Sequence, residues 1–380
     1  MMKLANPLRG KISPEIKYIL GLFLATRIIL TIIGCFAHII LDPRIPPRKY
    51  DLVFSKYLWL DIWGVWDTGW YVDIATNGYR ISSPFAGLEN QSNYAFFPLY
   101  PMLMRLLGTI IGDNYIAGLL LSNIFLLIAC IFLYKLVRLD AENETALRSV
   151  KYLFLFPNAF IFSGVFTEPL FLALVLICFY YAKKGNWPVV GLNGFLVSLT
   201  RPNGFWMILP LSYEYFKSKN FRFKNLRVDL LFLVLLPLGF LAYAFYVYHL
   251  TGNPRALFEI QYAWRVKFTN PLLVLWQGLL SQKYNDLFAT YFTIFFLWFL
   301  ILSFKKLNFS YWLYGMYMIL VPLAAGLDAM PRYILPVFPL YIAFAKFGEN
   351  SKLDQSFTIC LALLQGFLMV FWTLSFNLIV

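Results

Sequence analysis

Apolar runs of roughly 20 residues, the length that a helix needs to cross a bilayer core, recur along the whole chain of 380 residues. The first follows a basic N-terminal segment, and the last reaches the C-terminal region. Since the runs recur instead of occurring once near the N-terminus, the sequence predicts an all-α, polytopic membrane protein.

The composition supports this fold class and is far from that of an ordinary soluble domain. Hydrophobic residues make up 60% of the chain, aromatic residues 20% and charged residues only 13%. The sequence shows no Gly/Ser-rich linker and no repeat of fixed period, so residues 1–380 are expected to form a single transmembrane domain. We expect about 11 transmembrane helices, near residues 18–41, 114–134, 152–166, 169–182, 187–200, 204–216, 229–250, 287–304, 311–326, 332–346 and 356–378.

The opening segment MMKLANPLRGKISPEIK is basic, and the apolar run behind it lacks a small-residue cleavage pattern. We interpret this run as an uncleaved first span. Lys and Arg clusters in the N-terminus and in the loops between spans all fall on one side, which the positive-inside rule predicts to be cytoplasmic. The formal net charge of +13 is then mostly an orientation signal, and no nucleic-acid partner is expected.

The opposite, extracytoplasmic side is predicted to carry two large loops, residues 42–113 and 251–286. Within the second, residues 253–284 mix Trp, Phe and Leu with Arg and Lys, a pattern typical of an amphipathic helix in the membrane surface. Two spans, 152–166 and 187–200, are short for a bilayer, so their outer ends are expected to stop below the membrane surface. Ionisable residues at such a depth usually mark a polar site.

The segment WGVWDTGWYVDIATNGYR places two carboxylates among many aromatic rings. We expect a helix from Gly64 to Asn77 that ends before Gly78. Six-residue spacing puts Asp67 and Asp73 on different faces of a regular helix. Asp67 would lie near the helix N-terminus, where it is either a general base or a residue that caps the helix or pairs with its dipole, and Asp73 is expected to pair with an arginine.

No metal or other cofactor is expected to be required. The four cysteines lie in apolar runs without CxxC spacing, and the two histidines are far apart. A divalent cation that bridges a donor phosphate and Asp67 or Asp73 is left open, although the sequence shows no ligand set that demands one.

Two consecutive motifs, WDTGWYVDIATNGY and NYAFFPLYPMLMRLLG, resemble the signature of the PIG-V family of mannosyltransferases. Later blocks are also similar to that family, in the same order and over nearly the whole chain: LFPNAFIFSGVFTEPLF, GLNGFLVSLTRPNG and AMPRYILPVFPLY. The resemblance implies the GT-C fold of multi-span glycosyltransferases, a polyprenyl-phosphate-linked sugar donor, and transfer on the non-cytoplasmic face. It also implies an acidic catalytic residue in the first external loop, which the motif maps onto Asp67.

The chain is shorter than eukaryotic members of that family, which use a GPI-anchor acceptor. We therefore expect a bacterial homologue in the cytoplasmic membrane, with another lipid or glycan as acceptor. The resemblance favours mannose as the sugar. The acceptor and the need for a partner subunit are open.

A sugar linked through phosphate to a lipid carries an activated leaving group, so the protein must supply a base and positive charge. Asp67 is the predicted base. Arg201 and Arg332 are predicted to bind the donor phosphate, because guanidinium matches phosphate oxygens with paired donors, and Arg265 is a third candidate. Substrate contacts are expected from Trp66, Trp70, Asp73, Asn93, Tyr94, Glu168, Asn203 and Tyr333.

Two alternative functions are kept: a transporter or flippase of lipids or sugars, and a non-catalytic subunit that binds a glycolipid. Transporters commonly place their polar site near the bilayer midplane and contain two related halves. Here the charges collect at the external ends of the spans and no inverted repeat is evident, which favours the enzyme.

Overall fold

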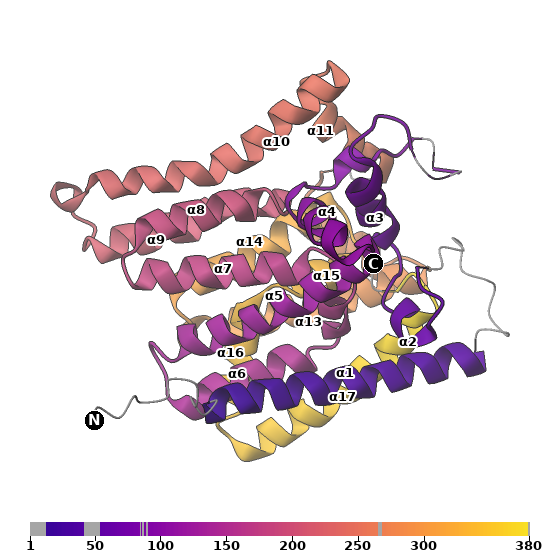
Figure 1. The fold of residues 1–380 in the computed structure, drawn as a ribbon. Coiled ribbons are helices and arrows are strands. Elements are labelled where there is room, and N and C mark those ends of the chain that lie inside the picture. Colours follow the sequence, from indigo (N-terminus) through magenta and orange to yellow (C-terminus); the bar gives the residue numbers. More distant parts are fainter. Residues whose placement is uncertain are drawn as a thin grey trace, which may run out of the picture.

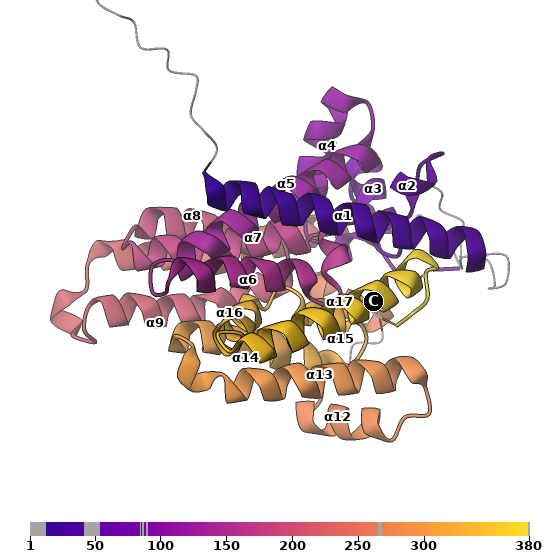
Figure 2. The same ribbon diagram turned by 90° about the horizontal axis from the view of Figure 1, so that it is seen from below.

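A computed structural model describes residues 13–41, 54–83, 85, 87–88, 90–264 and 268–378. Within these ranges the chain forms helices, turns and irregular segments and no strand, which confirms the all-α prediction. Figures 1 and 2 show a bundle whose longer helices run side by side, with shorter helices gathered at one end. We call the end that carries α2, α3, α4 and α11 the loop end.

The helices that run along the bundle are α1 (Pro14–Leu41), α5 (Asn114–Val137), α6 (Asn143–Leu155), α7 (Glu168–Lys183), α8 (Trp187–Ser198), α9 (Ile208–Ser218), α10 (Leu235–Thr251), α13 (Tyr284–Leu302), α14 (Phe309–Ala325), α16 (Phe338–Phe347) and α17 (Ser351–Thr373). The remaining α-helices are α2 (Leu58–Asp61), α3 (Thr68–Asn77), α4 (Leu99–Ile111), α11 (Ala256–Glu259), α12 (Pro271–Leu279) and α15 (Met330–Ile334). Turns of 3₁₀-helix are η2 (Asn93–Ala95), η3 (Ala159–Ser163), η4 (Pro202–Met207), η5 (Phe223–Asn225), η6 (Val228–Val234), η7 (Ile260–Trp264) and η8 (Phe304–Lys306).

Five helical stretches of the described chain are long and apolar enough to cross a membrane, namely α1, α5, η6 with α10, α13 and α17. Several shorter apolar helices accompany them. The protein is therefore an integral membrane protein. Helix α7 is the centre of the bundle: it packs on α5 and α8, and most of its residues are buried, as expected of a helix that is apolar all round.

The expected span at residues 152–166 is wrong in its boundaries. Helix α6 begins earlier, at Asn143, and ends at Leu155, and the chain continues as η3. The reason is Pro157, which disfavours helical geometry at the residue before it; Phe156 accordingly has ψ 140°. The break lets the chain turn back inside the bundle, so that residues 164–168 form a buried corner.

The second surface segment also differs from the expectation of one amphipathic helix over residues 253–284. Its described residues form α11, η7 and α12. Asn270 and Pro271 begin α12, where the Asn270 side chain accepts a hydrogen bond from the Leu272 amide and proline occupies the first helical position. Apolar side chains of α12, including Trp276, are exposed.

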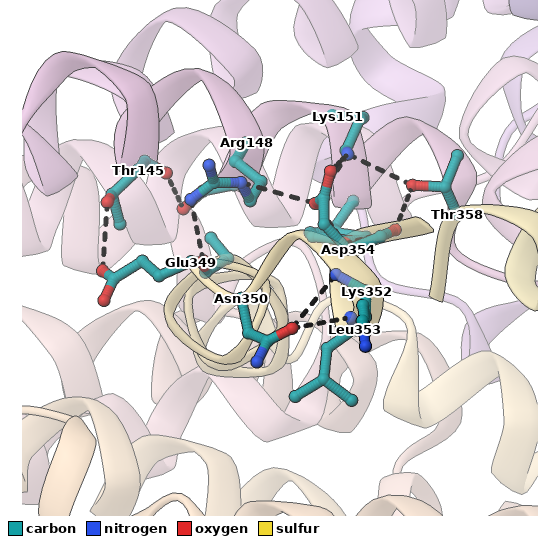
Figure 3. A network of polar contacts seen from close by, with 12 residues as sticks. Thr145, Arg148, Lys151, Glu349, Asn350, Lys352, Leu353, Asp354 and Thr358 are labelled. Atoms are coloured by element: carbon teal, nitrogen blue, oxygen red, sulfur yellow. Dashed lines mark hydrogen bonds and ion pairs between the residues drawn. The ribbon is translucent and has the colours of Figure 1, made fainter. Parts of the chain in front are cut away.

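The end of the bundle opposite the loop end is held by a polar network (Figure 3). Both carboxylate oxygens of Asp354 on α17 accept from Lys151 Nζ on α6 at 2.8 Å, and Arg148 Nε lies 3.4 Å from the same carboxylate. Arg148 also donates to the Ala345 carbonyl of α16 at 3.2 Å, and Lys151 donates to Thr358 at 3.1 Å. The network therefore connects α6, α16 and α17 far from the helices of the loop end.

Candidate functional site

A cavity of about 360 Å³ opens at the loop end of the bundle. Its wall combines residues of the first long loop with the corners before α7, η4 and α15, which are far apart in the sequence. The residues that line it are Trp66, Asp67, Gly69, Trp70, Tyr71, Phe85, Leu88, Gln91, Ala95, Phe96, Phe97, Thr167, Thr200, Arg201, Pro202, Gln261, Asp328, Ala329, Arg332, Tyr333 and Asn377.

Asp67 owes its position to an irregular turn that precedes α3. The predicted helix start at Gly64 is wrong, because α3 begins at Thr68 and Trp66 has a left-handed φ of 52°. A bulky residue rarely adopts that conformation. The predicted helix end, before Gly78, is confirmed, since Gly78 follows Asn77 with φ 81°.

Asp67 lies at the N-terminal end of α3, as expected, but its side chain makes no capping hydrogen bond. Its Oδ2 instead accepts from Nη1 of Arg332. The capping interpretation of Asp67 is thus not supported. The carboxylate is presented to the cavity and paired with a guanidinium.

Four charged side chains form a continuous network behind this wall. Arg332 Nε donates to Glu168 Oε1 at 2.5 Å, and Arg201 Nη1 lies 2.6 Å from the same oxygen. Arg332 also holds Asp67, so Glu168 and Arg332 connect the first loop to two corners. Glu168 is fully buried and both arginines are nearly so. A buried group of charges is tolerated only when its members compensate one another, and here two acids face two arginines.

Aromatic rings orient the two guanidinium groups. Arg332 lies 4.7 Å from the ring centre of Phe166, and Arg201 lies 5.1 Å from that of Tyr333. Stacking of this kind suits arginine in particular, because its guanidinium is planar. The rings leave the edges of both groups available for hydrogen bonds.

Trp70 and Tyr71 of α3 form the aromatic side of the cavity. Trp70 stacks on Phe96, with ring centres 5.5 Å apart, and Tyr71 meets Phe96 edge to face at 5.3 Å. Burial raises the pKa of the Tyr71 hydroxyl well above its usual value, so this group is protonated at neutral pH. The cavity thus combines an apolar aromatic wall with a charged wall, as ligand sites commonly do.

Some residues predicted to contact substrate lie behind the cavity instead of on its wall. Asp73 binds Arg80 and accepts from Asn77 and Asn93 at 2.9 Å. Asn93 also donates to the Gly78 carbonyl at 3.0 Å and accepts from the Arg80 amide at 2.9 Å. Asp73 therefore pairs with an arginine, as expected, and with Asn93 it fixes the path of the first loop.

The other predicted residues are divided between the cavity and its surroundings. Trp66, Trp70 and Tyr333 line the cavity together with Asp67, Arg201 and Arg332. Tyr94 is buried and its carbonyl accepts from the Tyr243 hydroxyl at 2.8 Å. Asn203 is buried in η4 next to the Arg201 corner. Arg265 lies outside the described residues.

Several cavity residues are not among the predicted substrate contacts, although Asp328 belongs to the corner motif that pointed to Arg332. Thr167 and Thr200 adjoin Glu168 and Arg201, so the corner motifs that pointed to those charges could have indicated them. Asp328 is exposed at the cavity, and the following Ala329 has φ 58°, a strained value for alanine. No sequence signal marks Gln261 or Asn377, which reach the cavity only through the folding of distant segments.

Among the described residues, no three His, Cys, Asp or Glu side chains lie close enough together to hold a metal ion. The charged wall of the cavity is a network of ion pairs between carboxylates and guanidinium groups. Its arginines suit an anionic ligand.

No family model and no curated protein sequence matches this chain. Among solved structures it is similar to ArnT from Cupriavidus metallidurans bound to undecaprenyl phosphate, with a TM-score of 0.53 and 10% identity. That alignment covers 94% of this chain and 76% of ArnT. A weaker likeness links it to the oligosaccharyltransferase of Archaeoglobus fulgidus, with a TM-score of 0.44 and 13% identity, over 93% of this chain and 55% of that one.

The likeness to ArnT shows the fold, and it confirms the GT-C fold predicted from the sequence. At 10% identity it does not extend to the PIG-V family. That resemblance continues to rest on the motifs themselves.

Proposed function

We propose that this protein is a membrane glycosyltransferase that moves a hexose from a polyprenyl-phosphate-linked donor to a hydroxyl of a lipid or glycan acceptor. The observation that carries the proposal is the Asp67–Arg332–Glu168–Arg201 network at the wall of the cavity. It combines the base and the cationic groups that such a transfer needs. ArnT, which shares the fold, has been solved with undecaprenyl phosphate bound, and the sequence motifs favour mannose as the sugar.

Arg201 and Arg332 would bind the donor phosphate. Both contact the single oxygen Glu168 Oε1, which keeps the two guanidinium groups close together although their mutual repulsion would separate them. A phosphate has more negative charge and more acceptor oxygens than the shared carboxylate can offer. Arg332 would then exchange its contact with Asp67 for one with the phosphate, and Asp67 would be released for the acceptor.

The released Asp67 carboxylate would take the proton of the acceptor hydroxyl. The hydroxyl oxygen forms a bond to the anomeric carbon of the sugar, and the bond from that carbon to the phosphate oxygen breaks. The electron pair remains on the phosphate, whose growing charge the arginines stabilise. The products are a glycoside and a polyprenyl phosphate, and a single displacement of this kind inverts the anomeric carbon.

The loop end is proposed to face the non-cytoplasmic side of the membrane, in bacteria the outer side of the cytoplasmic membrane. Support comes from the lysines in the last turns of α5, α7, α9 and α16. Figure 1 shows that these helices end at the opposite end of the bundle. Positive residues favour the cytoplasmic side.

The test is transfer of labelled mannose from synthetic polyprenyl-phosphate-mannose to a membrane lipid extract by the purified protein. Asp67→Asn keeps the shape of the side chain but cannot accept the proton, and we expect its turnover to fall by about 100-fold or more. Asp113→Asn is the matched control, because Asp113 is an exposed cap of α5 and asparagine caps helices equally well.

Equal product from the wild type and Asp67→Asn, with both correctly folded, would exclude Asp67 as the base. No product from the wild type with mannose, glucose or other hexose donors, in the presence of the lipid extract, would count against the transferase itself.

A further inference from the structure

Arg27 is a buried cation in the middle of α1, outside the cavity described above. Its Nη1 donates to the Ser163 hydroxyl at 2.7 Å and to the Ala159 carbonyl at 3.3 Å. Ser163 in turn donates to the side-chain oxygen of Asn123 at 2.7 Å. This chain of hydrogen bonds fixes one edge of the guanidinium against η3 and α5.

The other edge of Arg27 has no partner within the described structure. Its Nε and Nη2 are buried without a hydrogen bond, and no carboxylate of the described residues forms an ion pair with it. Nε and Nη2 are the pair of donors that binds two oxygens of a phosphate or carboxylate side by side. A buried, uncompensated cation in a membrane helix is costly, so this edge calls for an anion.

A cavity of about 250 Å³ lies beside this guanidinium, between α1, α2 and α5. Thr31, Asn123 and Ser163 supply further polar groups to its wall, together with Trp59 and Trp63. Large apolar side chains on the outside of the same helices are exposed, among them Ile28 of α1 and Leu120 of α5. Leu120 also lines the cavity. In a membrane protein such residues face lipid, so the cavity opens toward the bilayer.

We infer that this cavity binds the phosphate group of an anionic membrane lipid, with the free edge of Arg27 as its main ligand. The argument depends on charge complementarity, because the cavity offers a cation and neutral polar groups, and no acid is among the described residues that line it. The exposed Trp59 on this wall suits a lipid whose polar group is buried while its chains remain in the bilayer.

This site is separate from the cavity of the proposed transferase. The two cavities have no lining residue in common, and the chain segment from Trp63, which lines one, to Trp66, which lines the other, runs between them. Lipid binding at Arg27 therefore does not rest on the proposed reaction and is tested by binding alone.

The experiment measures the thermal unfolding midpoint of the purified full-length protein in detergent, titrated with phosphatidylglycerol or, for comparison, phosphatidylcholine. A ligand that binds only the folded protein raises this midpoint. We expect a saturable rise of a few degrees with phosphatidylglycerol alone. Arg27→Gln should abolish the rise, whereas Arg105→Gln, which removes an exposed arginine of α4, should retain it.

Leu120→Trp is a second variant, which fills the mouth of the cavity and leaves the guanidinium in place. It should also abolish the rise in the unfolding midpoint, so it tests the lipid site independently if Arg27→Gln does not fold. Undecaprenyl phosphate is tested in the Arg332→Gln background, where the proposed donor site is disabled. If that lipid raises the unfolding midpoint only when Arg27 is present, a polyprenyl phosphate is identified as an occupant of the cavity. This result would support the site.

Equal rises in the wild type, Arg27→Gln and Leu120→Trp would overturn the inference, as would the absence of a rise with every lipid phosphate. A rise with inorganic phosphate alone would show a small-anion site and overturn the assignment to a lipid.

Discussion

Glu168 is the residue on which the arrangement of both arginines depends. It is fully buried, and its Oε1 is the common partner of Arg201 and Arg332. The sequence marked all three as charges at helix corners and predicted phosphate binding for the arginines. It could not show that one carboxylate oxygen joins them, because that depends on how the corners before α7, η4 and α15 meet in three dimensions.

Replacing Glu168 with Gln should destabilise the protein strongly, because two buried arginines would lose their shared counter-charge. Removal of one member of a buried ion pair typically costs about 3–5 kcal/mol. The unfolding midpoint in detergent measures this loss, and Glu144→Gln, at an exposed position of α6, is the control. If both variants melt at the same temperature, the network is not what stabilises this end of the bundle.

At the scale of the elements, the sequence predicted which segments are helical better than where each begins. Apolar runs locate α1, α5 and α17. The bounds of α1 and α5 agree closely with the expected spans, whereas α17 (Ser351–Thr373) begins and ends earlier than the expected 356–378. The error at α6 arose because hydrophobicity continues past Leu155 although Pro157 ends the helix. The error at α3 arose because Trp66 adopts a left-handed conformation, which no propensity favours and which only surrounding tertiary contacts can maintain.

The network of α6, α16 and α17 allows stability and activity to be separated. Asp354→Asn should weaken the contacts to Lys151 and Arg148 shown in Figure 3. We expect a loss of about 1–2 kcal/mol in the free energy of unfolding, since the carboxylate is partly exposed. Glycosyl transfer per folded molecule should stay unchanged, because the network lies far from the loop end. A fall in that specific activity would show that the two ends of the bundle are coupled.

For the whole molecule, the fold class followed from apolar runs alone, and the GT-C fold followed from the order of the motifs. The full shape of the cavity did not. Its wall draws on residues from Trp66 to Asn377, and positions such as Gln261 reach it only because the intervening helices pack as they do. Charge at helix ends is visible in a sequence, whereas uncharged side chains that complete a site are not.

The orientation of the molecule can be tested by cysteine labelling. In a cysteine-free background, Asn90→Cys in the first loop should react with a membrane-impermeant maleimide added to intact cells stripped of their outer layers. Lys184→Cys, after α7, should react only once the membrane is permeabilised. Both positions are exposed, so access to the reagent is the only difference expected. The reverse pattern would place the cavity on the cytoplasmic side.

The contact between Arg332 and Asp67 also sets the kinetic order of the proposed reaction. As long as Arg332 holds this carboxylate, an acceptor that arrives first finds no group to receive its proton. Donor must bind before acceptor becomes reactive, which is a compulsory-order scheme. The product polyprenyl phosphate occupies the same arginines, so it inhibits the transfer reaction in competition with the donor. The rate of transfer then depends on how quickly this product is removed from the membrane.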